Sequence, residues 1–195
     1  MEKGLTMQKT KIEDVKGLIL VFTGEGKGKT TAAMGTALRM VRHGKRVGMV
    51  QFFKTGTSAT KASADRRDSA CLPARQGLGT RFKTWSFGGG FTWSTSRKEN
   101  AKTVQKAWKK CRELLTDPKY GLVILDEIHI ALKYKFLKSS EVIPTLKKRP
   151  ALQHVILTGR GAPQAIIRVA DLVTEMKCIK HSFKKGILAQ PGIEF

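Results

Sequence analysis

Cysteine is scarce in this 195-residue sequence, and its placement limits what the chain can build. Cys71, Cys111 and Cys178 lie far apart, and no two of them form a CxxC pair. An odd number of widely spaced cysteines excludes a disulfide framework and a four-cysteine zinc site as the organising principle. We therefore predict free, buried thiols.

Long apolar runs are also missing. No stretch approaches the roughly 20 consecutive apolar residues that a membrane-spanning helix needs. The first 17 residues, MEKGLTMQKTKIEDVKG, are polar and lack the apolar core of a signal peptide. We expect a cytoplasmic protein with no membrane partner.

Acidic residues are few compared with basic ones. Lys and Arg number 37 and Asp and Glu number 15, which leaves a formal net charge of +22. Such a charge attracts polyanions. A nucleic acid and a small anionic ligand are both consistent with it. Charge alone does not choose between these partners.

The apolar pattern predicts an α/β fold. The predicted core strands are residues 18–22, 46–53, 122–126, 154–159 and 172–177, and residues 81–87 are expected to return to the sheet. Helices are expected at 29–43, at 98–117, near 127–134 and 139–148, and from 162 onward. The second has an apolar stripe of Ala101, Val104, Trp108, Cys111 and Leu115. These elements predict a mostly parallel sheet of five or six strands flanked by helices, and together with the glycine-rich segment 23–31 described below they predict one P-loop (RecA-like) domain.

Two regions stand apart from this pattern. Residues 1–16 are expected to form a flexible arm, so the domain would span 17–195. Residues 54–80 have no clear period and are rich in Ser, Ala, Thr and Arg, which predicts a long loop.

The segment TGEGKGKTT, residues 23–31, joins the first strand to the first helix. Gly28, Lys29 and Thr30 match the end of the phosphate-loop pattern GxxxxGK[ST], although Thr23 stands at its first position. Glycines let backbone N–H groups point toward an anion, and the helix directs its positive end to the same place. Lys29 would neutralise terminal phosphates, and the Thr30 hydroxyl would bind Mg²⁺.

A second motif, LVILDE, supplies acidic residues at a strand end. Four apolar residues lead to Asp126, which falls at the carboxyl edge of the sheet, where ligands of such sheets bind. Asp126 would hold the metal directly or through water. Glu127 would be a further ligand of the metal or a base for water.

Three classes of P-loop protein compete at this point. The segment DEIH, residues 126–129, imitates a DExH box, and the net charge suits a nucleic-acid motor. Such motors need two ATPase lobes, however, and this chain has room for one. A thymidine-type nucleoside kinase usually carries a four-cysteine zinc site, which three cysteines cannot build.

The downstream segments point to a third class. They are GFTW (90–93), LDEIHIALKY (125–134), TGRGAP (158–163), ADLVTEM (170–176), KHSF (180–183) and AQPGIEF (189–195). Together with TGEGKGKTTAA and VGMVQFFK, this ordered set strongly resembles the P-loop ATP:cob(I)alamin (corrinoid) adenosyltransferases. The resemblance covers roughly residues 17–54 and 85–195.

The resemblance implies that ATP is not hydrolysed. A Co(I) corrinoid would attack the 5′ carbon of the ribose, and triphosphate would leave intact. Gly24, Glu25, Gly26, Lys27, Gly28, Lys29, Thr30, Thr31 and Arg160 would bind the nucleotide, and Thr30, Asp126 and Glu127 would hold Mg²⁺. Lys29 would act catalytically by stabilising charge on the leaving group.

The resemblance also assigns a role to GGGFTW. Phe91 and Trp93 would line the lower face of cobalamin or cobinamide, help displace the lower axial ligand and so ease reduction of cobalt(II). It further implies an electron-donating reductase and a homodimer as partners, and an N-terminal arm that folds over the corrinoid. Nucleic acid is not an expected partner.

Residues 55–84 depart from the family pattern. A Gly-Glu pair, a helix and a short strand are expected there, but TSATKASADRRDSACLPARQGLG occupies the place. Two interpretations of this segment remain: a divergent surface loop, and a stretch read out of frame. Glu25 is a smaller departure, since the family often has Asn or Asp there, and we predict that it faces the sugar.

Overall fold

The computed structural model describes residues 15–54, 81–88, 96–190 and 192–193. Its centre is a six-stranded sheet in the order β3-β2-β4-β5-β1-β6. Every neighbouring pair is parallel. The strands are β1 (Ile19–Thr23), β2 (Arg46–Phe52), β3 (Phe82–Phe87), β4 (Tyr120–Asp126), β5 (His154–Thr158) and β6 (Leu172–Glu175). The predicted α/β class and parallel sheet are confirmed.

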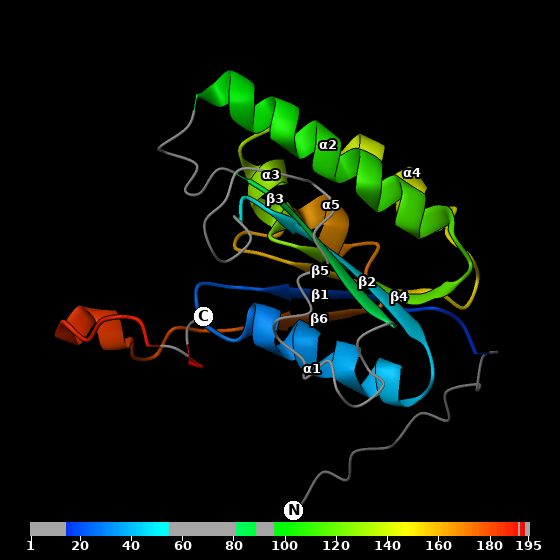
Figure 1. Ribbon diagram of the computed structural model, residues 1–195. Helices are drawn as coiled ribbons and strands as arrows, with labels where there is room; N and C mark the ends of the chain where they lie inside the picture. Colours follow the sequence, from blue (N-terminus) through cyan, green and yellow to red (C-terminus); the bar gives the residue numbers. More distant parts are fainter. Residues whose placement is uncertain (1–14, 55–80, 89–95, 191, 194–195) are drawn as a thin grey trace, which may run out of the picture.

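Helices cover both faces of this sheet (Figure 1). They are α1 (Lys29–Arg42), α2 (Arg97–Thr116), α3 (Ile128–Lys133), α4 (Ser139–Lys147) and α5 (Gln164–Ile167). A short 3₁₀ helix, η1 (Ser182–Lys185), lies in the C-terminal segment. In Figure 1, α1 lies on one side of the sheet and α2 to α5 lie on the other.

The strand β4 shows how one apolar run serves two cores. Leu122 and Ile124 belong to the cluster packed under α1, whereas Val123 and Leu125 belong to the cluster under α2. Side chains of a strand alternate between faces, so a strand covered on both sides must be apolar throughout. This explains why apolar and polar residues do not alternate in the run LVIL, residues 122–125.

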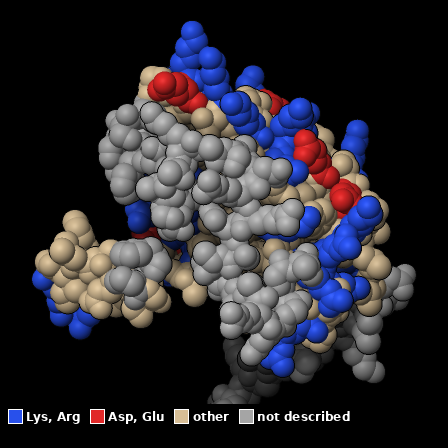
Figure 2. Space-filling view, viewed as in Figure 1, with Lys and Arg blue, Asp and Glu red and all other residues tan. Residues whose placement is uncertain are grey.

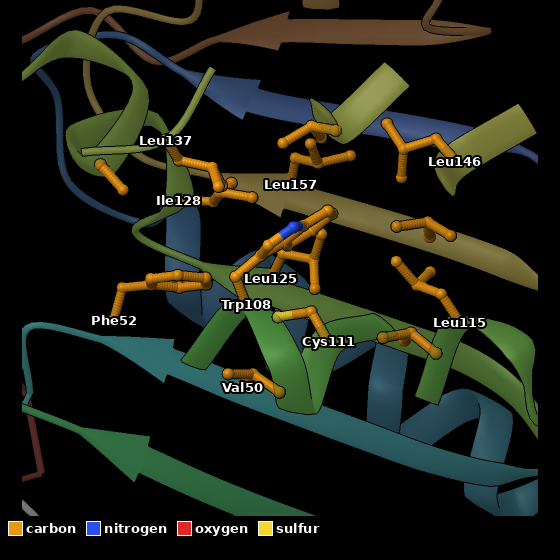
Figure 3. Packing of buried hydrophobic residues seen from close by; sticks show 14 of the residues in the cluster. Val50, Phe52, Trp108, Cys111, Leu115, Leu125, Ile128, Leu137, Leu146 and Leu157 are labelled. Carbon is orange, nitrogen blue, oxygen red and sulfur yellow. The ribbon is translucent and has the colours of Figure 1, made fainter. Parts of the chain in front are cut away.

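The predicted stripe of α2 forms the larger core. Trp108, Cys111 and Leu115 are buried and pack toward Leu125 and Leu157 of the sheet (Figure 3). The helix begins with a capping box, in which Ser96 and Glu99 satisfy each other's backbone N–H groups. Cys111 is buried, as predicted, but Cys178 is only partly buried, and Cys71 lies outside the described residues.

One prediction about the core was wrong. Residues 172–177 were expected to be a core strand, but all four residues of β6 are exposed. β6 pairs only with β1 and lies last in the strand order, so nothing in the described part of the chain covers its outer edge. Its apolar residues Leu172 and Val173 therefore remain accessible.

Beyond β6 the C-terminal segment leaves the body of the domain and extends to one side (orange to red in Figure 1). Elsewhere on the face drawn in Figure 2, Lys and Arg are more widespread than Asp and Glu, as the composition requires. No helix in the described ranges has the length and apolar character needed to cross a membrane.

Candidate functional site

The loop between β1 and α1 makes a turn that glycine permits. Gly24 has φ 96° and Gly28 has φ 104°, a region that side-chain-bearing residues rarely adopt. Gly26 is held by its own N–H, which donates to the carbonyl of Met176 at 2.6 Å. The loop therefore lies against the chain that follows β6.

Lys29 sits inside this loop and is buried. Its Nζ donates to the carbonyl of Gly24 at 2.8 Å and also to the carbonyl of Gly26. Burial lowers the pKa of Lys29, and the nearby carboxylate of Glu127 partly opposes this. The ammonium is thus directed into the curve of the loop, where an anion would meet it.

The helix α1 begins at Lys29 with an unusual start. Its N-cap, Gly28, offers no side-chain oxygen, and its first turn contains no acidic residue. The first N–H groups of a helix have no partner within the helix, and they carry partial positive charge. This end of α1 therefore keeps donors for an external anion. Thr31 and Lys27 are exposed beside it.

Asp126 is the centre of the polar network at this edge of the sheet. Its carboxylate is fully buried and accepts four hydrogen bonds. Oδ1 accepts from the hydroxyls of Thr30 at 2.9 Å and Thr158 at 2.7 Å. Oδ2 accepts from Gln51 Nε2 at 3.2 Å and Lys54 Nζ at 2.7 Å. The two motifs predicted to share one metal are therefore in direct contact.

Three members of this network were missed by the sequence reasoning. Gln51 lies near the end of β2, Lys54 follows that strand by two residues, and Thr158 ends β5. The available signal was the appearance of polar residues at the carboxyl ends of two apolar strands. Their partner could not be read from the pattern, since only the strand order brings β2 and β5 to either side of β4.

Glu127 follows Asp126 in a left-handed conformation, with φ 63°. Its N–H donates to the hydroxyl of Thr158, and its Oε2 is buried with no hydrogen-bond partner among the described residues. Burial raises the pKa of Glu127, and the charge of Asp126 acts in the same direction. A buried carboxylate oxygen without a donor is costly, and a metal ion or water would relieve this cost.

His129 is a buried neighbour that the sequence reasoning did not assign. Neither ring nitrogen has a hydrogen-bond partner of good geometry in the described part of the chain. The backbone of Leu157 lies near enough to raise the pKa of the ring slightly. Burial lowers the pKa of His129 to about 4, so the ring is neutral at pH 7. The Cβ of His129 also lies close to Gly159, where an added methyl group would meet it at 3.0 Å.

Arg160 extends from the turn after β5 and approaches the phosphate loop. Its Nη1 lies 3.3 Å from Oε2 of Glu25, and both side chains are more than half exposed. Glu25 therefore faces a cation here, and its contact with the sugar stays a prediction. Phe91 and Trp93 lie outside the described residues.

Comparison with known proteins decides the class. The family model described as ATP:corrinoid adenosyltransferase BtuR/CobO/CobP matches residues 15–195. This chain belongs to that family. A corrinoid adenosyltransferase of Pseudomonas aeruginosa is 43% identical over 93% of this chain and 85% of its own length. A corrinoid adenosyltransferase of Escherichia coli K12 is 40% identical over 94% of this chain and 88% of its own length.

A third corrinoid adenosyltransferase, from a Sinorhizobium species, is 44% identical over 93% of this chain and 82% of its own length. The predicted family is therefore confirmed. The alternative of a DExH-type ATPase receives no support from these matches.

Proposed function

We propose that this chain transfers the 5′-deoxyadenosyl group of ATP to the Co(I) centre of cobalamin or a related corrinoid and releases triphosphate. The observation that carries the proposal is the contact between Thr30 and Asp126, which joins the phosphate loop to an acidic strand end in a member of this family. In this reaction the bond between C5′ and its oxygen breaks, and its electron pair leaves with the triphosphate. The cobalt electron pair forms the new cobalt–carbon bond.

The loop residues would bind the leaving group. The first turn of α1 supplies N–H donors, and Lys29 supplies a charge that is already desolvated. Lys27, Thr31 and Arg160 would add contacts at the exposed rim. We retain Glu25 as a contact to the ribose, with Arg160 as the partner that keeps its charge from repelling the phosphates.

Mg²⁺ is the metal to which this donor set is suited. The set consists of the Thr30 hydroxyl, the Asp126 carboxylate and the unpartnered oxygen of Glu127. No group of three potential His, Cys, Asp or Glu ligands occurs among the described residues, and Mg²⁺ usually completes its shell with phosphate oxygens and water. When bound, the ion would stabilise charge that develops on the triphosphate.

The remaining assignments rest on the family. Phe91 and Trp93 would line the lower face of the corrinoid, and a reductase would supply the electron that forms Co(I). A single domain over 17–195 with a mobile arm at 1–16, and a cytoplasmic location, complete the proposal.

A homodimer would use the surface around β6. Leu172 and Val173 are exposed on an edge strand, and Ile179, Phe183 and Leu188 are 86%, 71% and 78% exposed in the segment that follows. Apolar side chains in such number favour a protein partner, and a second copy of the chain would cover them. Sedimentation of the purified protein, compared with Phe183→Ser, would test this.

The activity is tested by incubating the protein with ATP, Mg²⁺, a chemical reductant and cobalamin. We expect a light-sensitive alkylated corrinoid to accumulate with triphosphate. Formation of ADP, stimulated by DNA or RNA and without alkylated cobalt, would instead identify a nucleic-acid-dependent ATPase.

A further inference from the structure

The side chain of Lys54 lies next to the carboxylate of Asp126. This contact cannot be predicted from the position of Lys54 in the sequence. Its Nζ lies 2.7 Å from Oδ2 of Asp126 and 3.5 Å from Oγ1 of Thr30. The side chain of Lys54 is 37% exposed, whereas that of Asp126 is fully buried. A cation that reaches in from solvent thus contacts two of the three residues proposed to hold the metal.

The backbone at Lys54 is fixed from two sides. Phe53 turns the chain at φ 58°, and its ring lies 6.1 Å from that of Phe136, measured between centroids. On the other side Gly88, just after β3, approaches so closely that a Cβ there would lie 2.6 Å from the carbonyl carbon of Phe53 and 2.8 Å from the N of Lys54. The ammonium is therefore held on a built support rather than on a free surface loop.

The other donors to Asp126 are fixed as well. Thr158 accepts from the N–H of Glu127, so its own proton is directed at Oδ1. Gln51 accepts from Ser86 through its Oε1, which directs its amide N–H groups at Oδ2. Lys54 is the donor in this network with a long, partly exposed side chain, and it can leave without disturbing a strand.

A metal ion and an ammonium compete for the same carboxylate oxygen. A buried carboxylate needs a compensating charge, which Lys54 supplies in the described structure. A divalent cation approaching Asp126 and Thr30 would meet the positive charge of Lys54 at the same two oxygens, and like charges at this range repel.

We propose that Lys54 is a positioning residue that fills the metal position of the nucleotide-free enzyme and moves to the triphosphate when metal and ATP arrive together. The ammonium keeps Thr30 and Asp126 in place, disfavours metal without nucleotide, and then neutralises phosphate oxygens. Metal binding thereby depends on the nucleotide. This inference rests on the proposed metal role of Thr30 and Asp126.

The test measures binding of Mn²⁺ to the protein by electron paramagnetic resonance of the free ion, with and without ATP, against protein-free samples that show how much Mn²⁺ the ATP alone binds. In wild type we expect weak Mn²⁺ binding that ATP strengthens. Lys54→Met should tighten Mn²⁺ binding without ATP by about tenfold and shrink the strengthening by ATP accordingly, within the usual range of coupling between two ligands. Lys54→Arg keeps the charge and should behave more like wild type.

The matched control is Lys83→Met, which removes the same charge from an exposed position on the neighbouring strand β3. If Lys54→Met does not fold, Lys54→Gln replaces it, because it removes the charge and keeps a donor for Asp126. Unchanged Mn²⁺ affinity in the Lys54 variant, or an equal change in Lys83→Met, would overturn the inference.

A further variant separates this inference from the proposed metal site. Asp126→Asn should weaken Mn²⁺ binding in the presence of ATP. If it does so while Lys54→Met changes nothing, the metal site stands and the role of Lys54 is wrong. If Asp126→Asn leaves Mn²⁺ binding with ATP unchanged, the metal site fails, and the role of Lys54 fails with it.

Discussion

The hydroxyl of Thr30 donates a hydrogen bond to Oδ1 of Asp126 over 2.9 Å, although 96 positions separate the two residues in the sequence. Thr30 is in the first turn of α1, and Asp126 is the last residue of β4. The parallel sheet brings these two elements together at its carboxyl edge. A hydroxyl and a carboxylate in contact, beside a phosphate loop, form the proposed metal site.

Replacing Thr30 by Val removes both the hydrogen bond to Asp126 and the hydroxyl proposed to bind Mg²⁺. We expect the affinity for ATP in the presence of Mg²⁺ to fall by at least about tenfold, while the affinity without metal changes little. Isothermal titration of ATP with and without Mg²⁺ measures both. Thr30→Ser, which keeps the hydroxyl, should restore most of the difference; equal losses under both conditions would argue against the metal role.

Lys29→Ala removes the ammonium that the loop carbonyls of Gly24 and Gly26 hold in place. Because that charge would stabilise the departing triphosphate, we expect kcat/KM to fall by about 100-fold or more. Circular dichroism should show an intact fold. Lys45→Ala, an exposed lysine before β2, is the matched control and should keep its activity. Wild-type turnover in Lys29→Ala would refute the proposed role.

Gly26→Ala tests the close approach of the phosphate loop to the segment after β6. A Cβ at Gly26 would lie 2.7 Å from the carbonyl oxygens of both Met176 and Lys177, which are backbone atoms that cannot turn aside. We expect ATP to bind more weakly. Gly35→Ala is the control: nothing lies within 4 Å of its added Cβ, and its helical position should gain up to about 1 kcal/mol in unfolding free energy. Unaltered ATP binding in Gly26→Ala would show that the loop has room to move.

Phe91→Ala and Trp93→Ala test the assignment that rests on the family. If these rings help remove the lower ligand of the corrinoid, each variant should be slowed more when the reaction starts from cobalt(II) with a reductase than when it starts from chemically reduced Co(I). The two rates can be compared by following the alkylated product. Equal losses by both routes would make these rings ordinary packing residues.

His154 predicts a pH dependence of stability away from the site. Its Nδ1 accepts from the N–H of Leu18 at 3.1 Å, which requires the neutral ring, and burial, with Arg149 and Lys45, lowers its pKa. The unfolded chain therefore takes up a proton at a pH where the folded protein resists it. Stability should fall as the pH drops below the usual histidine range near 6.5.

Urea unfolding at pH 7.5 and 5.5 measures this effect. His154→Asn keeps an acceptor for Leu18 without titrating, so its unfolding free energy should depend less on pH than that of wild type. His43→Asn, at an exposed histidine after α1, should retain the wild-type dependence. Identical pH dependence in wild type and His154→Asn would contradict the expectation.

Much of the fold and part of the site could be predicted from the sequence, because they depend on local patterns. The loop around Gly28 and the strand ending at Asp126 are signalled by residues adjacent in the chain. Lys54, Gln51 and Thr158 are not, since their common partner is set by the order of the strands. The position of β6 was misjudged for a related reason: its apolar residues resemble a core strand, and only the topology shows that it is an edge.

The fate of the phosphates tests the central claim most directly. Wild-type protein would be incubated with Mg²⁺, reduced cobalamin and ATP labelled in separate experiments at the α or the γ phosphorus, and the products separated by chromatography. We predict that both labels appear in inorganic triphosphate, in amounts equal to the alkylated cobalamin formed. Retention of the α label in ADP, with the γ label in inorganic phosphate and cobalt left unalkylated, would contradict the account.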